Sequence, residues 1–434
     1  MRRLIVPTVL AFVGLSVAFA LIRSGAPHRT GRPLRSGTAL LPAARPEPLV
    51  LISERARVRV VTITDGLVEP WALAFLPNGD MLITERAGRL RLLHDGRPAS
   101  AIITGIPPVD TRAQDGLMDL ALHPRFADNH RLYFTYSKAG ERGDTTVLAG
   151  ARFDGAELAD VRDPFVANAW SAAGGNSGSR IAFGLDGTIY MTVGERHEQT
   201  PAQDLRTHKG KILRLNDDGT IPPDNPFVGR KNARPEIFAY GVRNPQGLFV
   251  EPSTGTIWEH EHGPRGGDEL NIIARGHNYG WPAITYGINY NGTTISKETA
   301  HDGMDQPVVH WTPSIAPSGL IIYSGDRFPA WGGNVFLGAL SGLDLRRLEL
   351  QNGRVTHEEV LQLLARGPRR IRDVRQGPDR LLYVLTDAGA LLRLEPNQRL
   401  GGASVLSTTR SRGTPSAVHC DCRPSHVHDG ALHR

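Results

Sequence analysis

Apolar and polar positions along the chain repeat one arrangement: a short apolar run, a turn rich in Pro, Asp, Asn and Gly, and a second run rich in β-branched or aromatic residues. Asp-Gly and Asn-Gly between alternating apolar runs are strong signals for a β-hairpin. The arrangement occurs as FLPNGDMLITE at Phe75, LHPRFADNHRLYFTY at Leu122, FGLDGTIYMTVGE at Phe183, VEPSTGTIWEHEHG at Val250, YSGDRFPAWGGNVFLGAL at Tyr323 and QGPDRLLYVLTDAGALLRL at Gln376. The chain is therefore predicted to consist mainly of short paired strands.

The spacing of the copies indicates how these strands pack. Copies that recur at roughly 45 to 80 residues are too far apart for a solenoid and are typical of four-stranded propeller blades. One blade cannot bury both faces of its sheet, whereas a closed ring of blades buries them and leaves only short edges. We expect an all-β fold, a six-bladed β-propeller over residues 48–396. The longest insertions, within residues 195–251 and 262–323, are where functional loops are expected.

The two ends of the chain depart from this pattern. A basic start precedes an apolar run over residues 4–22 that ends near the small-residue motif AFA, so residues 1–22 are predicted to be a signal peptide or an N-terminal anchor. Residues 23–47, rich in Pro, Arg, Gly and Ser, are predicted to be a flexible linker, and residues 397–434 a disordered tail. Export would place the main domain in the periplasm or elsewhere outside the cytoplasm.

Charge and cysteine content narrow the range of partners. The formal net charge is +6, but no dense basic patch alternates with aromatic residues, which argues against nucleic acid as a partner. Membrane contact is expected only through the N-terminal run. The only two cysteines, Cys420 and Cys422, lie in the tail, where histidines flank them: His419, His426, His428 and His433. This segment fits a soft metal ion or a plain disordered extension, and the globular part contains no disulfide.

Four polar clusters stand out against the predicted hairpins. They are AQDGLMD with Gln114, YGVRNPQG with Arg243, Asn244 and Gln246, EHEHGPRGGDE over residues 259–269, and RRIRD with Arg370 and Arg372. Loops from all blades of a propeller converge on one end of its axis, so residues remote in sequence can share a site. The arginines offer forked donors for a small ligand with several carboxylates or phosphates. The alternative is that they form ion pairs on the surface or between blades.

The EHEHGPRGGDE stretch raises the question of a metal. His260 and His262 alternate as in a strand and can face one way, but no third imidazole lies at ligand spacing, which disfavours zinc. Glycines and a proline beside carboxylates suit a hard, oxygen-liganded ion such as Ca²⁺, which readily accepts backbone carbonyls.

Long motifs carry a family resemblance. GVRNPQG, EHGPRGGDELN, NYGWP, PAQDLRTHKGKILRLNDDGTIPPDNPF and RIRDVRQGPD together resemble the soluble aldose sugar dehydrogenases that use pyrroloquinoline quinone (PQQ), the glucose/sorbosone dehydrogenase family of six-bladed propellers. The resemblance covers nearly all of residues 60–394.

The resemblance implies a cofactor site and two calcium sites. PQQ is a tricyclic o-quinone with three carboxylates, and the residues at the family positions that contact it are Gln114, Arg243, Asn244, Arg370 and Arg372. The carbonyls of Gly263 and Pro264 match those that hold the Ca²⁺ touching the quinone. Glu269 and the carbonyl of Tyr279 match a separate, structural Ca²⁺ site.

The resemblance also implies a reaction. An aldose would lose the proton of its C1 hydroxyl and a hydride from C1, giving a lactone, while Ca²⁺ and Arg243 stabilise the negative oxygen that develops. The protein supplies position and electrostatics and the quinone the redox chemistry. The substrate is thus a small sugar, and the motifs identify neither the electron acceptor nor the oligomeric state.

This sequence departs from the family at the catalytic centre. The family's proton acceptor is a histidine four residues before an arginine, whereas NSGSR places Asn176 there, before Arg180. A carboxamide accepts no proton near neutral pH, and general-base catalysis typically contributes about 10²–10⁴-fold. His197, in GERHEQ, is a candidate substitute or simply a solvated loop residue. Ser341, in GALSG, replaces a lysine or arginine directed at the cofactor, which predicts weaker quinone binding.

Three functions fit these observations. The first is a PQQ-dependent sugar dehydrogenase with Arg243 and Asn176 at the catalytic positions. The second is a non-catalytic or altered-function propeller that binds sugar or quinone. The third, a calcium-dependent lactonase, is disfavoured because no set of side-chain carboxylates for one channel metal is evident.

Overall fold

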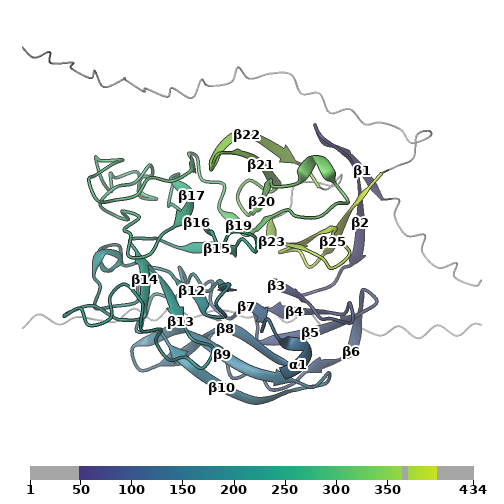
Figure 1. Ribbon diagram of the computed structural model, residues 1–434, viewed down its shortest axis with the longest axis horizontal. Coiled ribbons are helices and arrows are strands. Elements are labelled where there is room, and N and C mark those ends of the chain that lie inside the picture. Colours follow the sequence, from purple (N-terminus) through teal and green to yellow (C-terminus); the bar gives the residue numbers. More distant parts are fainter. Residues whose placement is uncertain (1–47, 364–369, 398–434) are drawn as a thin grey trace, which may run out of the picture. The chain divides into compact units, whose positions relative to one another are not determined.

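The computed structural model describes residues 48–363 and 370–397. The predicted signal peptide or anchor, the linker and the Cys/His tail lie outside these residues. Within them, the chain forms six antiparallel sheets, arranged as blades around a common centre (Figure 1), and the predicted six-bladed propeller is confirmed. Helices are limited to α1 (Phe126–Asn129) and the 3₁₀ turns η1 (Thr200–Gln203) and η2 (Pro329–Trp331). No helix in the described part is long and apolar enough to cross a membrane.

The blades follow one another along the chain, each beginning with its innermost strand. The first blade comprises β3 (Pro70–Phe75), β4 (Met81–Glu85), β5 (Arg89–His94) and β6 (Arg97–Ile103). The second comprises β7 (Leu117–Leu122), β8 (Arg131–Gly140), β9 (Gly143–Phe153) and β10 (Leu158–Val166). The third comprises β11 (Ile181–Phe183), β12 (Ile189–Val193), β13 (Lys211–Leu215) and β14 (Ile237–Tyr240).

The fourth blade comprises β15 (Pro245–Val250), β16 (Ile257–Glu261), β17 (Asp268–Ile273) and β18 (Val309–Trp311). The fifth comprises β19 (Pro317–Ile322), β20 (Val335–Ala339), β21 (Leu345–Gln351) and β22 (Arg354–Leu361). The sixth comprises β23 (Ile371–Gln376), β24 (Leu382–Thr386) and β25 (Leu391–Pro396), and two strands from the start of the propeller complete it: β2 (Arg57–Thr64) and β1 (Leu49–Ile52).

Each of the six sequence repeats crosses from an innermost strand into the second strand of its blade. FLPNGDMLITE, for example, contains the turn between β3 and β4, and QGPDRLLYVLTDAGALLRL the turn between β23 and β24. Several second strands are buried along their whole length, as in β4 and β12. Stacked blades cover both faces of these strands, so burial is continuous along them and does not alternate.

An N-terminal strand closes the ring. β2 pairs antiparallel with β25, from Val58 opposite Pro396 to Thr64 opposite Leu391, and Figure 1 shows the purple β2 beside the yellow-green β25. The last blade would otherwise expose the edge of β25. Pairing the two ends of the propeller satisfies the backbone hydrogen-bonding groups of that edge and joins the first and last blades.

The innermost strands are tied together by a buried ion network on the axis. Arg180, only 2 % exposed, places Nη1 3.3 Å from Asp119 Oδ1 and 3.1 Å from Asp373 Oδ1. Arg375 bonds the same two carboxylates at 2.9 Å each. Arg180 also donates through Nε to the carbonyl of Gln246 at 2.7 Å and stacks 4.1 Å above the ring of Trp71. The guanidinium of Arg180 therefore contacts residues in four other blades, those whose first strands are β3, β7, β15 and β23.

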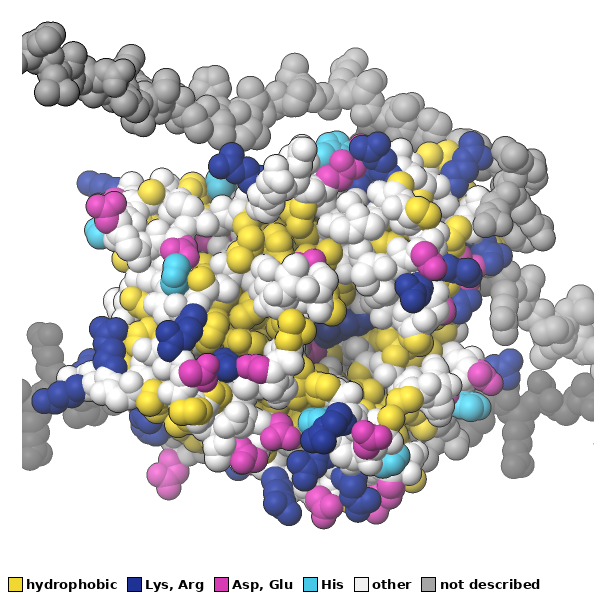
Figure 2. Space-filling model, viewed as in Figure 1, with side chains coloured by type: hydrophobic (Ala, Val, Ile, Leu, Met, Phe, Trp, Pro, Cys, Tyr) yellow, Lys and Arg dark blue, Asp and Glu magenta, His cyan; other side chains and the backbone are white. Residues whose placement is uncertain are grey.

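The far end of the axis is apolar. A hollow of about 390 Å³ lies between the last residues of five innermost strands and is lined mostly by hydrophobic side chains, among them Phe75, Leu122, Phe183 and Phe249. Hydrophobic side chains surround the centre of the face seen in Figure 2. The last residues of the innermost strands line this hollow. Their first residues therefore lie at the opposite end of the axis.

The axial network predicts a large stability effect. Arg180→Leu should lower the free energy of unfolding by about 3–5 kcal/mol, because it leaves Asp119 and Asp373 short of a buried countercharge. Chemical denaturation followed by intrinsic fluorescence measures the change. The matched control is Arg152→Leu, which removes an arginine from the exposed pair with Asp160 and should leave the denaturation midpoint unchanged. Equal midpoints for both variants would contradict the role given to the axial network.

Candidate functional site

The candidate residues gather at the end of the axis where the innermost strands begin. Gln114 precedes β7, Asn176 precedes β11, Arg243 and Asn244 precede β15, Arg370 precedes β23, and Arg372 is the second residue of β23. Turns that return to the same end contain Gly263 and Pro264 (between β16 and β17), His197 (between β12 and β13) and Ser341 (between β20 and β21). Strand direction alone therefore brings these separate motifs together.

Arg243 lies at the centre of this group. Its Nη1 donates to the carbonyl of His262 at 2.7 Å, and its Cζ lies 5.3 Å from the centre of the Trp281 ring. Its backbone amide donates to the Glu261 carboxylate, and its carbonyl accepts from the amide of Glu195 at 2.8 Å. The guanidinium of Arg243 is thus held by a carbonyl and a ring, and among the described residues no carboxylate forms an ion pair with it.

Asn244 connects the third and fourth blades. Its Oδ1 accepts from the amide of Gly178 at 3.1 Å and from Nε2 of Gln246 at 3.3 Å. These bonds orient the NSGSR segment toward Arg243. Asn244 is almost fully buried, so its side chain acts first as a structural support for the loop.

Arg370 and Arg372 share one carboxylate. Arg370 Nε lies 2.6 Å from Asp387 Oδ2, and Arg372 Nε lies 2.8 Å from Oδ1. Burial by itself would raise the pKa of Asp387, but the two positive charges hold it below its usual range. Two guanidinium groups against one carboxylate leave an excess positive charge at this edge of the site. The ion-pair interpretation therefore describes Arg370 and Arg372 here, and the ligand-binding interpretation stays a prediction.

Asn176 is engaged as a hydrogen-bond donor. Its Nδ2 donates to Glu195 Oε1 at 2.6 Å, and its backbone adopts a left-handed conformation with φ of 45°. The same Oε1 accepts from the amide of His197 at 3.1 Å. Glu195 is buried, and its Oε2 finds no partner among the described residues. This carboxylate was not among the residues singled out from the sequence.

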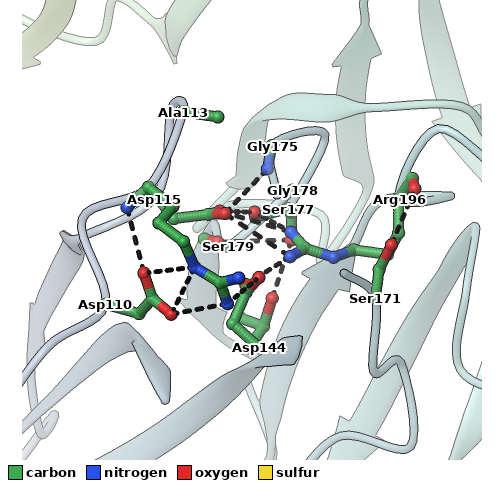
Figure 3. Close-up of polar contacts among 12 residues, drawn as sticks. Asp110, Ala113, Asp115, Asp144, Ser171, Gly175, Ser177, Gly178, Ser179 and Arg196 are labelled. Carbon is green, nitrogen blue, oxygen red and sulfur yellow. Dashed lines mark hydrogen bonds and ion pairs between the residues drawn. The ribbon is translucent and has the colours of Figure 1, made fainter. Parts of the chain in front are cut away.

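A second buried ion cluster supports this loop from below (Figure 3). Arg196 is fully buried between Asp115 and Asp144, and it also donates to the hydroxyl of Ser177. Asp115 accepts from the amide of Gly175 at 2.7 Å and from the Ser177 hydroxyl. The cluster fixes the segment before β11 to the loop before β7, which contains Gln114.

The histidines of EHEHGPRGGDE face the neighbouring blade. His260 Nε2 lies 3.0 Å from the carbonyl of Gly319, and His262 Nε2 lies 2.7 Å from the carbonyl of Pro317. Burial lowers the pKa of both imidazoles to about 3, so both are neutral and donate to β19. They do face one way, but no group of three His, Cys, Asp or Glu side chains in the described part is arranged to hold a metal ion.

The opposite face of the same hairpin carries buried carboxyl groups. Glu259, Glu261 and Glu269 are all buried, and burial raises the pKa of each, to about 8 for Glu269. Glu259 Oε2 accepts from Asn271 Nδ2 at 3.1 Å, while Glu259 Oε1 and Asn271 Oδ1 lack partners within the described residues. Orphaned oxygens beside charged neighbours fit a hard cation, provided that amide and backbone oxygens complete the shell.

The loop at the tip of this hairpin requires glycine. The amide of Gly263 donates to Asp268 Oδ1 at 2.8 Å, and a Cβ on Gly263 would stand 2.1 Å from the carbonyl oxygen of Gly266. The backbone therefore doubles back so closely that only glycine fits. Pro264 follows in this loop and is buried.

Tyr279 and Ser341 occupy the edges of the group. The long loop after β17 returns to the site because the amide of Tyr279 donates to the carbonyl of Tyr240 at 2.9 Å. The Tyr279 phenol donates to the carbonyl of Ile272 at 2.8 Å. Ser341 is exposed in its turn, where its amide donates to the carbonyl of Ile315 at 2.9 Å.

Fold and site together define a class: a six-bladed β-propeller with its cationic and polar loops gathered at one end of the axis. A family model described as Glucose / Sorbosone dehydrogenase matches residues 67–393. The chain is 42% identical over 362 residues to the aldose sugar dehydrogenase YliI of Escherichia coli, which spans 80% of this chain and 97% of that protein. This chain belongs to the glucose/sorbosone dehydrogenase family.

Solved structures agree with this assignment. The soluble aldose sugar dehydrogenase from Escherichia coli in the apo-form is similar with a TM-score of 0.76 at 42% identity, over 78% of this chain and 100% of that chain. The PQQ-bound form of aldose sugar dehydrogenase from Streptomyces coelicolor is similar with a TM-score of 0.64 at 27% identity, over 78% of this chain and 98% of that chain.

The buried carboxyl groups predict how stability depends on pH when divalent cations are removed. A pKa of Glu269 raised from its usual 4.5 to about 8 means that the folded state keeps a proton which the unfolded state has lost. In chelator, the free energy of unfolding should therefore fall as the pH rises from about 5 to 8. Urea denaturation at both pH values measures it.

Glu269→Gln should weaken this pH dependence, and added Ca²⁺ should reduce it in the parent protein. Glu251→Gln, at an exposed turn outside the cluster, is the matched control and should behave like the parent. A fall in stability of the same size in parent and Glu269→Gln would show that other groups cause it.

Proposed function

We propose that this protein oxidises aldoses at C1 to lactones with PQQ as its cofactor and Ca²⁺ as an auxiliary ion. The observation that carries the proposal is the surplus of guanidinium charge at the polar end of the axis, in a member of this family. Arg243 has carbonyl and aromatic contacts, and Arg370 and Arg372 have one carboxylate between them. A tricarboxylate ligand supplies the missing negative charge.

Each candidate residue has a defined task in this proposal. Arg370 and Arg372 bind carboxylates of the cofactor, while Gln114 and Asn244 orient it with neutral polar groups. When bound, the o-quinone supplies the two-electron oxidant that receives hydride from C1. Arg243, fixed over Trp281, directs its donors to the sugar oxygen on which negative charge develops, and a preorganised charge of this kind stabilises the transition state.

Calcium has two proposed positions. The carbonyls of Gly263 and Pro264 would hold one ion close to the cofactor, where it adds positive charge. Glu269 and the carbonyl of Tyr279 would hold the other, beside the orphaned oxygens of the buried carboxyl cluster. The second ion would neutralise charges that burial otherwise makes costly.

The remaining functions have less support. A propeller that binds sugar or quinone without turnover rests on Asn176 alone, whose amide is committed to Glu195. A lactonase needs several carboxylates around one channel metal, and the described residues contain no such side-chain group. We further propose that the protein acts outside the cytoplasm, exported or anchored through residues 1–22.

Reconstitution tests the proposed function. Apoprotein supplied with Ca²⁺ and PQQ should reduce an artificial dye in the presence of an aldose, and omission of either PQQ or the sugar should abolish the signal. Absorbance titration with PQQ measures binding separately. Tight binding without dye reduction would favour the binding-only alternative, and no binding would overturn the proposal.

Two arginine variants test the division of labour. Arg243→Ala should lower kcat by about 10²–10³-fold, the usual cost of one donor to a developing oxyanion. Arg370→Ala should mainly weaken PQQ binding, because Arg370 is exposed and Arg372 keeps the contact with Asp387. Steady-state kinetics with saturating PQQ separate the two effects. A larger kcat loss for Arg370→Ala would reverse the assigned roles.

A further inference from the structure

The proposed reaction needs a proton acceptor, and Asn176 cannot act as one. Its amide already donates to Glu195, and a carboxamide is not basic near neutral pH. The base must therefore lie elsewhere within reach of the same space, beside Asn176 and Gln114.

His197 points into this space. Gly175 lies immediately before Asn176, and a Cβ built on Gly175 would stand 3.0 Å from His197 Nε2. The same point lies 3.8 Å from Gln114 Oε1. The imidazole of His197 therefore covers Gly175, and its Nε2 lies close to the residue that precedes Asn176.

The backbone around His197 is strongly held. Arg196 and His197 both have left-handed backbones, with φ of 63° and 61°, a conformation that costs non-glycine residues free energy. The buried side chain of Arg196 is fixed by Asp115 and Asp144 (Figure 3), and the amide of His197 is fixed by Glu195 at 3.1 Å. Two unfavourable conformations in succession, maintained by buried ion pairs, indicate that the position of His197 is specified.

Burial and the surrounding charges lower the pKa of His197. Burial lowers its pKa below the usual 6.5, the positive charges of Arg243 and Arg196 lower it further, and Glu195 and Asp115 oppose them. The balance favours the free base near pH 7, which is the form that accepts a proton. The side chain is also exposed enough for a substrate to reach it.

We infer that His197 is the catalytic base of this chain, in place of the residue that Asn176 replaces. The inference rests on the proposed function. The O–H bond of the C1 hydroxyl breaks and its proton goes to Nε2 of the neutral imidazole, which becomes an imidazolium. The C1–H bond breaks at the same time, its electron pair leaves as hydride to PQQ, and C1 and its oxygen form the lactone carbonyl. Nε2 must be unprotonated at the start, so the proton of the neutral ring is on Nδ1.

Glu195 is the competing base. It is adjacent to both Asn176 and His197, and its Oε2 lacks a partner among the described residues. However, it is buried, and its other oxygen already accepts two N–H groups. Those contacts suit a carboxylate that positions the two side chains better than one that meets the substrate. The experiment below separates the two groups.

The experiment compares four variants of the full chain, loaded with Ca²⁺ and PQQ: His197→Ala, His197→Ala with Asn176→His, Glu195→Gln and His357→Ala. Dye-linked kcat is measured from pH 5 to 9, and PQQ affinity by absorbance titration. His197→Ala should lose at least about 10²-fold in kcat while PQQ affinity stays within twofold. The parent should lose activity as the pH falls through a pKa below 6.5, and His197→Ala should lack this acid limb.

Rescue distinguishes a base from a structural residue. Asn176→His should restore at least tenfold in kcat to His197→Ala, because it places an imidazole beside the same oxygen. His357→Ala, on the outer strand β22, should equal the parent. NMR titration of the apoprotein should give the His197 imidazole a pKa below 6.5, an observation independent of turnover.

The outcomes are separable. An active parent with an equally active His197→Ala, or with loss of activity only in Glu195→Gln, would overturn the inference and leave the proposed function intact. Loss of PQQ binding in His197→Ala would overturn it as well, since the residue would then position the cofactor. A parent that binds no PQQ overturns the proposed function, and the inference with it.

Discussion

The rest of the structure depends on one buried guanidinium. Arg180 immediately precedes the innermost strand of the third blade and contacts Trp71, Asp119, Gln246 and Asp373 of four other blades. Isolated charges are costly inside a protein, so this arrangement is stable only when both carboxylates and Arg375 are in place. It therefore fixes the relative positions of strands whose first residues form the site.

Two electrostatic environments meet at the polar end of the axis. The arginines at the beginnings of β15 and β23 are short of negative charge, whereas the hairpin of β16 and β17 buries carboxyl groups that are short of positive charge. An anionic cofactor suits the first and a hard cation the second. The two environments are adjacent in space. Arg243 donates to the carbonyl of His262, the residue just before Gly263 in the β16–β17 hairpin. Cofactor and cation are thus expected to bind cooperatively.

The proposed move of the catalytic base to another residue separates one task from the family scaffold. Asn244 and Glu195 hold the segment that carries Asn176. Under the proposed mechanism, the proton acceptor is His197, in the turn between β12 and β13. Its amide and the Asn176 side chain donate to the same carboxylate, that of Glu195. Family membership and catalytic assignment are for this reason separate questions: the first rests on the whole propeller, and the second on a few atoms.

The sequence by itself determined the hairpins, the number of blades and the family, because turn chemistry and strand alternation act between near neighbours and leave local motifs. It also put Gln114, Arg243 and Arg372 in separate polar motifs, and because propeller loops converge at one end of the axis, it predicted that they share a site. Only the tertiary structure decided that β2 closes the last blade, that Arg370 and Arg372 share Asp387, and that His197 covers Gly175. These contacts join residues far apart in the chain, and their energies depend on burial and distance, which no local pattern records.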